Sequence, residues 1–134
     1  MPTPRNSHAL IHVDGKLAAI GGSASAGYTG ANEVYDPATN SWATKAPTGS
    51  RNGLRGDRVR PDQLIVVGGL NNSGTLLNVA DLYDLPSNTW QALPAAPTKK
   101  RYHAAVSPVE GVLVCAGGIT ELSIGSAENE VYSI

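Results

Sequence analysis

The sequence predicts an all-β protein built from three successive copies of one repeat, the third of them shorter than the others. Gly-Gly pairs recur along the chain at nearly constant spacing, and each pair ends a short apolar run of strand length. The 134 residues include 15 Gly and 9 Pro without any low-complexity tract. Because Gly and Pro favour tight turns between short elements, this composition favours strands over helices.

Five markers stay in register between the copies. An arginine opens each copy, an apolar run leads to a glycine pair, and an acid–apolar–tyrosine triplet follows the pair. A tryptophan stands seven residues after the tyrosine in the first two copies. The arginines are Arg5, Arg51 and Arg101, the first glycines Gly21, Gly68 and Gly117, the tyrosines Tyr35, Tyr83 and Tyr132, and the tryptophans Trp42 and Trp90.

Each copy divides into four strand-like runs. In the first copy these are residues 8–13, 16–21, 31–36 and 41–46, and Asp14-Gly15 between the first two runs is a strong signal for a two-residue hairpin turn. The second run is apolar at every position, which is typical of a strand buried on both faces of a sheet. Four antiparallel strands in about 50 residues, stacked radially, form a β-propeller blade.

The repeat resembles the kelch motif. The resemblance rests on the glycine pair after the second run, the Tyr-Asp on the third (Tyr35-Asp36, Tyr83-Asp84) and the tryptophan seven residues later. It implies kelch-type blades in which the glycine pair permits a tight turn while the tyrosine and tryptophan pack between neighbouring blades. We therefore expect one kelch-repeat region over residues 1–134, with blades at about 5–50, 51–100 and, incomplete, 101–134.

Two departures from the pattern affect the predicted architecture. Residues 54–62 in the first strand of copy two carry five charges and a proline. We expect these charges to face the central channel or solvent, because unpaired burial is costly, or the strand to be distorted. Copy three stops at Ile134 without its outer strand, so eleven strands are predicted, in a partial propeller of three blades.

Three blades cannot close a ring, since closed propellers have roughly four to eight. Either the sequence is a fragment whose missing blades belong to the same chain, or a homodimer completes a six-bladed ring. The stop inside a repeat favours the fragment.

The charge balance and the absence of chemical motifs narrow the function classes. A net charge of −1 provides no basic field for nucleic acid or an anionic membrane, and we expect a soluble chain without signal peptide or membrane span, in an unknown compartment. We interpret Lys99-Lys100-Arg101 as a solvated loop and Cys115 as a core residue. We predict no catalytic residue, no cofactor and no metal site, because the three histidines lack companion ligands at zinc-site spacing.

The predicted binding face lies at the end where the first strands begin. Arg5, Arg51 and Arg101 start these strands, and the longest loops, residues 23–30, 70–77 and 119–126, follow the glycine pairs. The resemblance implies that these segments share a face that commonly binds partners, and loops on a rigid scaffold often carry function. The alternative for the arginines is a structural hydrogen bond to neighbouring backbone. The candidate binding residues are Arg5, Arg51, Arg101, His8, His103, Tyr28, Asn71 and Asn72.

Two short sequence motifs are interpreted as ordinary structural segments. Arg55-Gly56-Asp57 spells an adhesion tripeptide but lies in a predicted inner strand, and Asn71-Asn72-Ser73 fits the glycosylation acceptor pattern but also an ordinary turn.

The function predicted from the sequence is a non-catalytic binding or scaffold module that contacts protein through one loop face. The alternatives are part of a sugar-active kelch-type enzyme, an oxidase or a sugar-acid epimerase, and a carbohydrate-binding or adhesion propeller.

Overall fold

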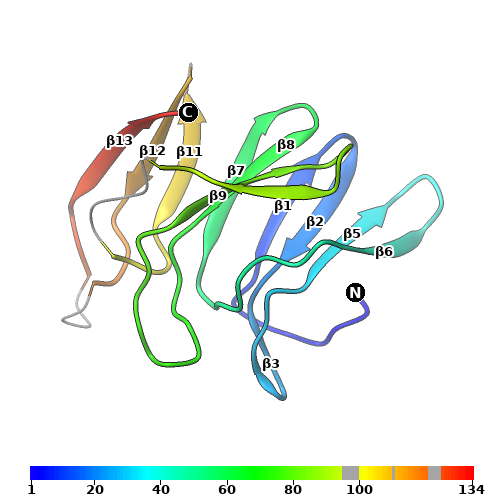
Figure 1. The fold of residues 1–134 in the computed structure, drawn as a ribbon, viewed down its shortest axis with the longest axis horizontal. Coiled ribbons are helices and arrows are strands. Elements are labelled where there is room, and N and C mark those ends of the chain that lie inside the picture. The colour runs from blue at the N-terminus through cyan, green and yellow to red at the C-terminus, as the bar shows by residue number, and fades with distance from the viewer. Residues whose placement is uncertain (95–99, 110, 121–124) are drawn as a thin grey trace.

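A computed structural model describes residues 1–94, 100–109, 111–120 and 125–134. Within these residues the protein contains strands and turns but no helix, and three larger sheets stand side by side like the blades of a fan (Figure 1). No helix in the described part of the chain is long and apolar enough to cross a membrane. The predicted all-β fold class and the kelch-type blade arrangement are confirmed.

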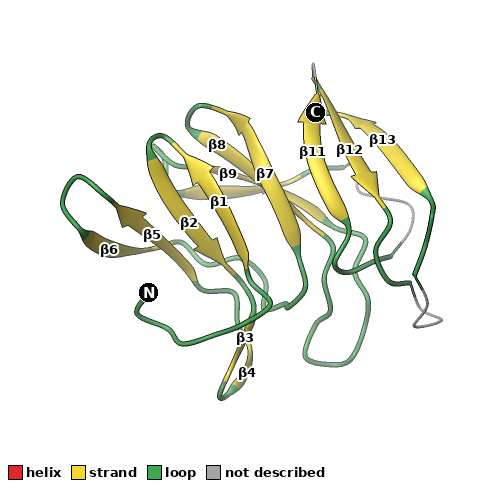
Figure 2. Cartoon of the chain, turned by 180° about the vertical axis from the view of Figure 1, so that it is seen from behind, coloured by secondary structure: helices red, strands yellow, loops and turns green. Residues whose placement is uncertain are grey.

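The sheets are antiparallel and follow chain order from the inside to the outside of each blade. The first sheet has the order β1-β2-β5-β6, the second β7-β8-β9-β10 and the third β11-β12-β13 (Figure 2). The first contains β1 (Ala9–Val13), β2 (Lys16–Ile20), β5 (Asn32–Asp36) and β6 (Ser41–Lys45). The second contains β7 (Arg55–Arg60), β8 (Gln63–Val67), β9 (Ala80–Asp84) and β10 (Thr89–Ala92). The third contains β11 (Ala105–Val109), β12 (Val112–Ala116) and β13 (Asn129–Ser133).

These three sheets contain the eleven predicted strands, and the third sheet ends at β13 within the described residues. The structure adds one hairpin that the sequence analysis assigned to a loop. Its strands β3 (Ser23–Ala24) and β4 (Gly27–Tyr28) are two residues long, too short for a hydrophobic period to reveal. The repeat boundaries stay a prediction, and the second of them falls beside residues 95–99, outside the described part.

The irregular charged run of copy two forms strand β7. It pairs with β8 along its length, and the register shifts between Arg58 and Arg60, as in a β-bulge. Both arginine side chains are exposed, so the bulged strand carries its charges without burying them. The prediction of solvent-facing charges and that of local distortion both hold.

The core consists of two apolar layers, one at each junction between sheets. The first layer joins Ile11, Ile20 and Val34 of the first sheet to Leu64 and Tyr83 of the second. The second layer is built from buried residues of the second and third sheets, with partly buried side chains around them. Because β8 lies between the two layers, both of its faces are buried, as its continuous apolar sequence predicted. The buried residues of the second layer are Ile65, Val67, Ala80, Leu113 and Cys115, flanked by the partly buried Val59, Leu82, Leu93, Val106, Tyr132 and Ile134.

In the first two repeats, the first glycine of the pair is required by the close approach of the next repeat. Gly68 has φ of +63°, and a Cβ there would collide with the backbone oxygen of Arg101. At Gly21, with φ of +66°, a Cβ would lie 2.6 Å from Leu54 and 2.9 Å from the oxygen of Arg51. The glycine pairs therefore allow two sheets to meet closely where the chain leaves the second strand.

Candidate functional site

The candidate site is the loop end of the molecule. The β3–β4 hairpin and the connection from β8 to β9 project from the same end of the sheets, at the bottom of Figure 1. The segments that lead into β1, β7 and β11 run beside these loops, because each forms an isolated bridge with the residue that directly follows a glycine pair. Alternation of strand direction in each sheet brings these segments together.

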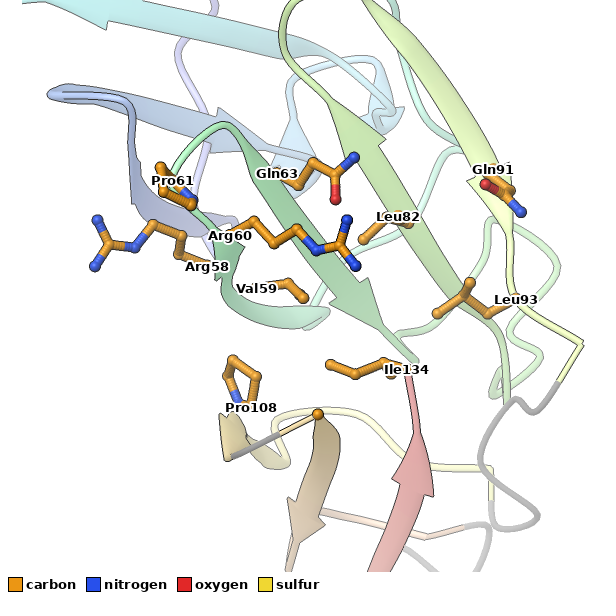
Figure 3. A pocket seen from close by; sticks show the side chains of 11 residues that line it. Arg58, Val59, Arg60, Pro61, Gln63, Leu82, Gln91, Leu93, Pro108 and Ile134 are labelled. Carbon is orange, nitrogen blue, oxygen red and sulfur yellow. The ribbon is translucent and has the colours of Figure 1, made fainter.

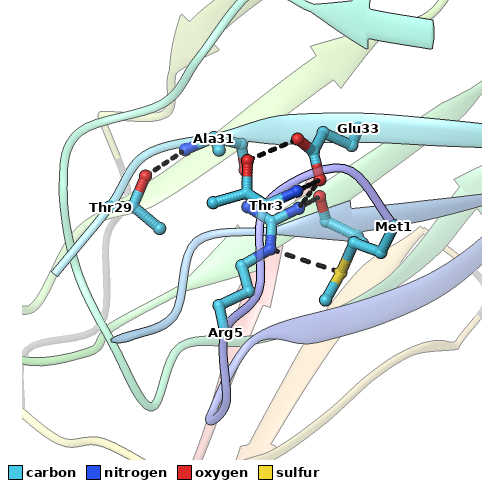
Figure 4. Close-up of polar contacts among 7 residues, drawn as sticks. Met1, Thr3, Arg5, Thr29, Ala31 and Glu33 are labelled. Carbon is cyan, nitrogen blue, oxygen red and sulfur yellow. Dashed lines mark hydrogen bonds and ion pairs between the residues drawn. The ribbon is translucent and has the colours of Figure 1, made fainter. Parts of the chain in front are cut away.

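The three opening arginines lie under this surface, each paired with the acid of its own repeat. Arg5 Nη2 lies 3.0 Å from Glu33 Oε2, and the two side chains are 0 % and 4 % exposed (Figure 4). The corresponding distances are 2.6 Å for Arg51 Nη2 to Asp81 Oδ2 and 2.7 Å for Arg101 Nη2 to Glu130 Oε2. Each guanidinium is therefore neutralised inside its own sheet.

Two of the arginines also donate to backbone carbonyls near the glycine pairs, whereas Arg51 Nη2 donates to Thr48 Oγ1 at 3.2 Å. Arg5 donates to the carbonyls of Ala31 and Ala19, both at 2.9 Å, and Arg101 donates to those of Gly117 and Glu128 at 3.0 and 3.2 Å. Burial lowers the pKa of Arg5, while the Glu33 carboxylate raises it. These contacts favour the structural alternative for the arginines, since a guanidinium with this set of partners has few donors left for a ligand.

The Arg–acid pairing was missed by the sequence analysis, although its signal is in the chain. The members of a pair are 28, 30 and 29 residues apart, and both recur as markers of the repeat. Recurrence of a cation and an anion at fixed offset in every copy predicts an ion pair within each repeat, and this comparison would have found it.

His8, Arg55 and His103 come together from the segments at the start of β1, β7 and β11. Arg55 Nη2 lies 2.8 Å from His103 Nδ1, and Arg55 Nη1 donates to the Leu54 carbonyl at 2.9 Å. Burial lowers the pKa of His8, and the charges of Arg5 and Arg55 lower it further. Burial and Arg55 also lower the pKa of His103. Arg55 was not among the residues selected from the sequence, where it belonged only to the tripeptide and to the charged run of residues 54–62.

Tyr28 and Asn72 join the loops of the first and second sheets. Tyr28 N donates to Asn72 Oδ1 at 2.8 Å, and Asn72 Nδ2 donates back to the Tyr28 carbonyl at 3.1 Å. Asn71 instead organises its own turn, because its Oδ1 accepts from the backbone N–H groups of Ser73 and Thr75. The structure thus brings Tyr28 and Asn72 into contact across two repeats and places Asn71 beside them.

The structure also places two other sequence signals, the tripeptide and the basic cluster. Asp57 of the tripeptide lies in β7 and accepts from Ser107 Oγ at 3.0 Å. Lys99 of the basic cluster lies outside the described residues, Lys100 is exposed, and Arg101 is only 1 % exposed. The interpretation of this cluster as a solvated loop is therefore wrong for Arg101, because its ion pair with Glu130 draws it inward.

The candidate groups for metal or thiol chemistry are sparse. The described residues include no cluster of three or more His, Cys, Asp or Glu side chains that could hold a metal ion. Cys115 is fully buried in the second core layer, and burial raises the pKa of its thiol to about 11. It is a core residue, as predicted.

A cavity of about 660 Å³ opens between the second and third sheets. Its lining residues come from the second sheet and from the end of the third, and they include Arg58, Arg60, Gln63, Leu82 and Ile134 (Figure 3). The corresponding space between the first and second sheets measures about 290 Å³. There β10 lies beside the junction, and Trp90 Nε1 donates to the Ala46 carbonyl at 2.8 Å.

Comparison with known proteins agrees with the sheet topology and the repeat markers. The model of the kelch motif matches residues 4–49 and 59–97. The chain belongs to the kelch-repeat family. Kelch-like protein 41a of Danio rerio is 29 % identical over 90 % of this chain and 20 % of its own length. Kelch-like protein 35 of Mus musculus is 29 % identical over 93 % of this chain and 22 % of its own length.

A plant relative of different name shows the same likeness. The Arabidopsis thaliana acyl-CoA-binding domain-containing protein 4 is 30 % identical over 86 % of this kelch-repeat chain and 18 % of its own length. The chain spans about a fifth of the length of these relatives.

Proposed function

We propose that this kelch-repeat chain is a non-catalytic binding or scaffold module that contacts another protein through its loop face. The face comprises the β3–β4 hairpin, the turn at Asn71 and Asn72, and the rim formed by His8, Arg55 and His103. A surface of this kind, made of loops from successive repeats, offers a partner several contacts at once.

The observation that carries the proposal is the hydrogen bonding between loops of different repeats. The reciprocal bonds of Tyr28 and Asn72 hold two loops in one arrangement before any partner arrives. The buried arginines, each in an ion pair with the acid of its own repeat, stabilise the segments next to these loops. A surface ordered in advance loses less conformational entropy on binding, which favours affinity. The names of the Kelch-like relatives are consistent with a shared repeat module.

Site-specific photo-crosslinking tests the proposal. A benzophenone side chain is placed at Tyr28 or Asn72 on the loop face, and at Thr39 in the turn between β5 and β6 as the control at the opposite end. In an extract of the source organism we expect the same defined protein to crosslink from Tyr28 and Asn72 and not from Thr39. Equal capture from all three positions, or capture from Thr39 alone, would contradict the proposed face.

A carbohydrate screen separates this function from the sugar-active alternatives. The chain is incubated with monosaccharides and sugar acids, and turnover, binding and bound copper are measured. We expect neither turnover nor tightly bound copper. Catalytic conversion of any sugar would overturn the non-catalytic assignment, whatever the crosslinking result.

A further inference from the structure

Arg55 is a half-buried arginine that forms no ion pair in the described part of the chain. It differs in this from the opening arginines of the repeats, each of which is paired with an acid. Its Nη1 donates to the Leu54 carbonyl at 2.9 Å, and its Nη2 lies 2.8 Å from His103 Nδ1. A guanidinium has five N–H donors, so three of those of Arg55 are left for a ligand.

The two histidines beside Arg55 each leave one ring nitrogen for a ligand. A guanidinium can only donate, so His103 Nδ1 accepts from Arg55 and the neutral ring carries its proton on Nε2. This ring lies against that of Tyr102, with the ring centroids 4.8 Å apart. His8 Nδ1 is buried and has no hydrogen-bond partner among the described residues, which leaves its Nε2.

None of the three residues is a feature of the repeat. A residue that the blade itself requires recurs in every copy, as the arginine–acid pairs do. The counterparts in the other two repeats are Ala9 and Ala105 for Arg55, Ser7 and Gly53 for His103, and Leu54 and Ala104 for His8. Formation of the blades therefore does not explain why these three side chains meet.

The charges that act on the two histidines are all positive in the described part of the chain. They are those of Arg5 and Arg55, and together with burial they lower the pKa of the rings. Arg5 is itself paired with Glu33. The acid of β7, Asp57, accepts from Ser107 Oγ at 3.0 Å and makes no ion pair with Arg55. The positive charge of Arg55 is therefore uncompensated at this rim.

We propose that His8, Arg55 and His103 form a phosphate-binding site that holds a phosphorylated side chain of the protein partner. A phosphate monoester supplies a charge of about −1.5 to −2 at pH 7 and three strong acceptor oxygens. Arginine suits such a group because its planar fork presents several donors at once. The inference rests on the proposed function for the source of the phosphate, whereas recognition of the anion can be tested on the chain alone.

Binding at this site should strengthen as the pH falls. A bound anion favours the charged form of a histidine beside it, so it counteracts the effect of Arg55 on both rings. Protonation of the rings and binding of the anion therefore support each other below about pH 6.5, the ordinary histidine value.

Titration with sulfate and with inorganic phosphate gives the first test. Sulfate remains a dianion throughout the relevant pH range, so any pH dependence of its binding comes from the protein. With NMR of the histidine rings as the readout, we expect both anions to raise the pKa of His8 and His103. Sulfate should bind at least about tenfold more tightly at pH 5.5 than at pH 7.5. Unchanged histidine pKa values in excess sulfate, or equal affinity at both pH values, would overturn the proposal.

Two variants and a matched control locate the anion. Arg55→Gln should weaken phosphate binding at least about tenfold, whereas Arg58→Gln, which removes an exposed arginine from the same strand, should stay within about twofold of wild type. His8→Gln/His103→Gln should abolish the pH dependence of sulfate binding, and it carries the test if circular dichroism shows that Arg55→Gln does not fold. Equal losses in the two arginine variants would indicate general attraction by charge and overturn the site.

A pair of small ligands distinguishes a phosphorylated side chain from a carboxylate. N-acetylphosphoserine methylamide and N-acetylaspartate methylamide carry the two groups on the same backbone. We expect the phosphoserine compound to bind at least about tenfold more tightly, because it has more charge and more acceptor oxygens. Equal or tighter binding of the aspartate compound would overturn the assignment to phosphate.

Phosphatase treatment separates this inference from the proposed function. The crosslinking from Tyr28 is repeated in an extract treated with phosphatase, and we expect the crosslinked partner to be lost. Crosslinking that survives the treatment would overturn the phosphate inference and leave the loop face standing. Absence of a partner in the untreated extract would contradict the proposed function, while the titrations with sulfate and phosphoserine would still decide whether the anion site exists.

Discussion

The buried arginine of each repeat combines two roles that a single residue type can supply. Its guanidinium offers five donors in a planar fork, so one side chain can pair with a carboxylate and also satisfy carbonyls of the neighbouring strands. Arg51 is 2 % exposed and lies against Asp81, which is itself 21 % exposed. Burial lowers the pKa of Arg51, and Asp81 raises it through its charge and its hydrogen bond. The side chain therefore stabilises the segment beneath the loops only while its partner is present.

Removal of this arginine should destabilise the fold. Arg51→Ala leaves Asp81 largely buried without its cation, and we expect the free energy of unfolding to fall by about 3 kcal/mol. Urea denaturation followed by tryptophan fluorescence measures the change. Arg58→Ala, which removes an exposed arginine from β7, should alter stability by no more than about 0.5 kcal/mol. Equal effects of the two substitutions would show that the buried ion pair is not structural.

At the scale of the element, the glycine pair decides how closely successive sheets can pack. In the first two repeats the second strand ends where the backbone of the next repeat approaches, and only a residue without Cβ fits there. The sequence shows this requirement as an unbroken Gly-Gly marker, yet the cause lies about 30 residues further along the chain. The bulge in β7 likewise has a local signal and a cause elsewhere in the chain. The charged sequence predicted an irregular strand, whereas pairing with β8 determined where the register shifts.

A methyl group at the first glycine of the pair should weaken the junction. Gly68→Ala forces alanine into positive φ and against the Arg101 carbonyl, and we expect a loss of roughly 2–3 kcal/mol. Gly49→Ala is the matched control, because a Cβ at Gly49 would meet nothing within 4 Å and its φ is not positive. Chemical denaturation of both variants measures the difference. Retention of wild-type stability in Gly68→Ala would mean that the junction tolerates the extra atom by opening.

At the scale of the whole molecule, assembly of the three sheets creates an electrostatic site that no single repeat contains. His8 and His103 precede the first strands of the first and third sheets, and Arg55 begins that of the second. Burial lowers the pKa of both histidines, and the charge of Arg55 lowers it further. The unfolded chain, whose histidines titrate near 6.5, therefore binds protons before the folded protein does as the pH falls. The contribution of these groups is complete above pH 6.5 and declines below it.

Acidification should thus destabilise the wild-type protein more than a variant without the two histidines. We expect His8→Gln/His103→Gln to lose less stability than wild type between pH 7.5 and pH 5.5, measured from denaturation midpoints at each pH. His12→Gln, at an exposed position in β1, should follow the wild-type curve. Identical pH dependence of wild type and double variant would show that proton uptake by other groups controls stability in this range.

The amino-acid sequence by itself determined the repeat, the strands and the family, because periodic glycines, apolar runs and aromatic markers are local and recur in register. Strand positions in the first sheet could be predicted to within a residue or two for the same reason. The site could be predicted only in part. Tyr28, Asn72, His8 and His103 were selected from their loops, whereas Arg55 and the arginine–acid pairs were not.

The tertiary structure alone decided which side chains meet across repeats. It turned the three arginines from surface candidates into buried partners of Glu33, Asp81 and Glu130, since closure of each sheet brings together groups about 30 residues apart. These contacts depend on the direction of the backbone in space and on how neighbouring strands are placed, which the strand patterns of the sequence do not encode.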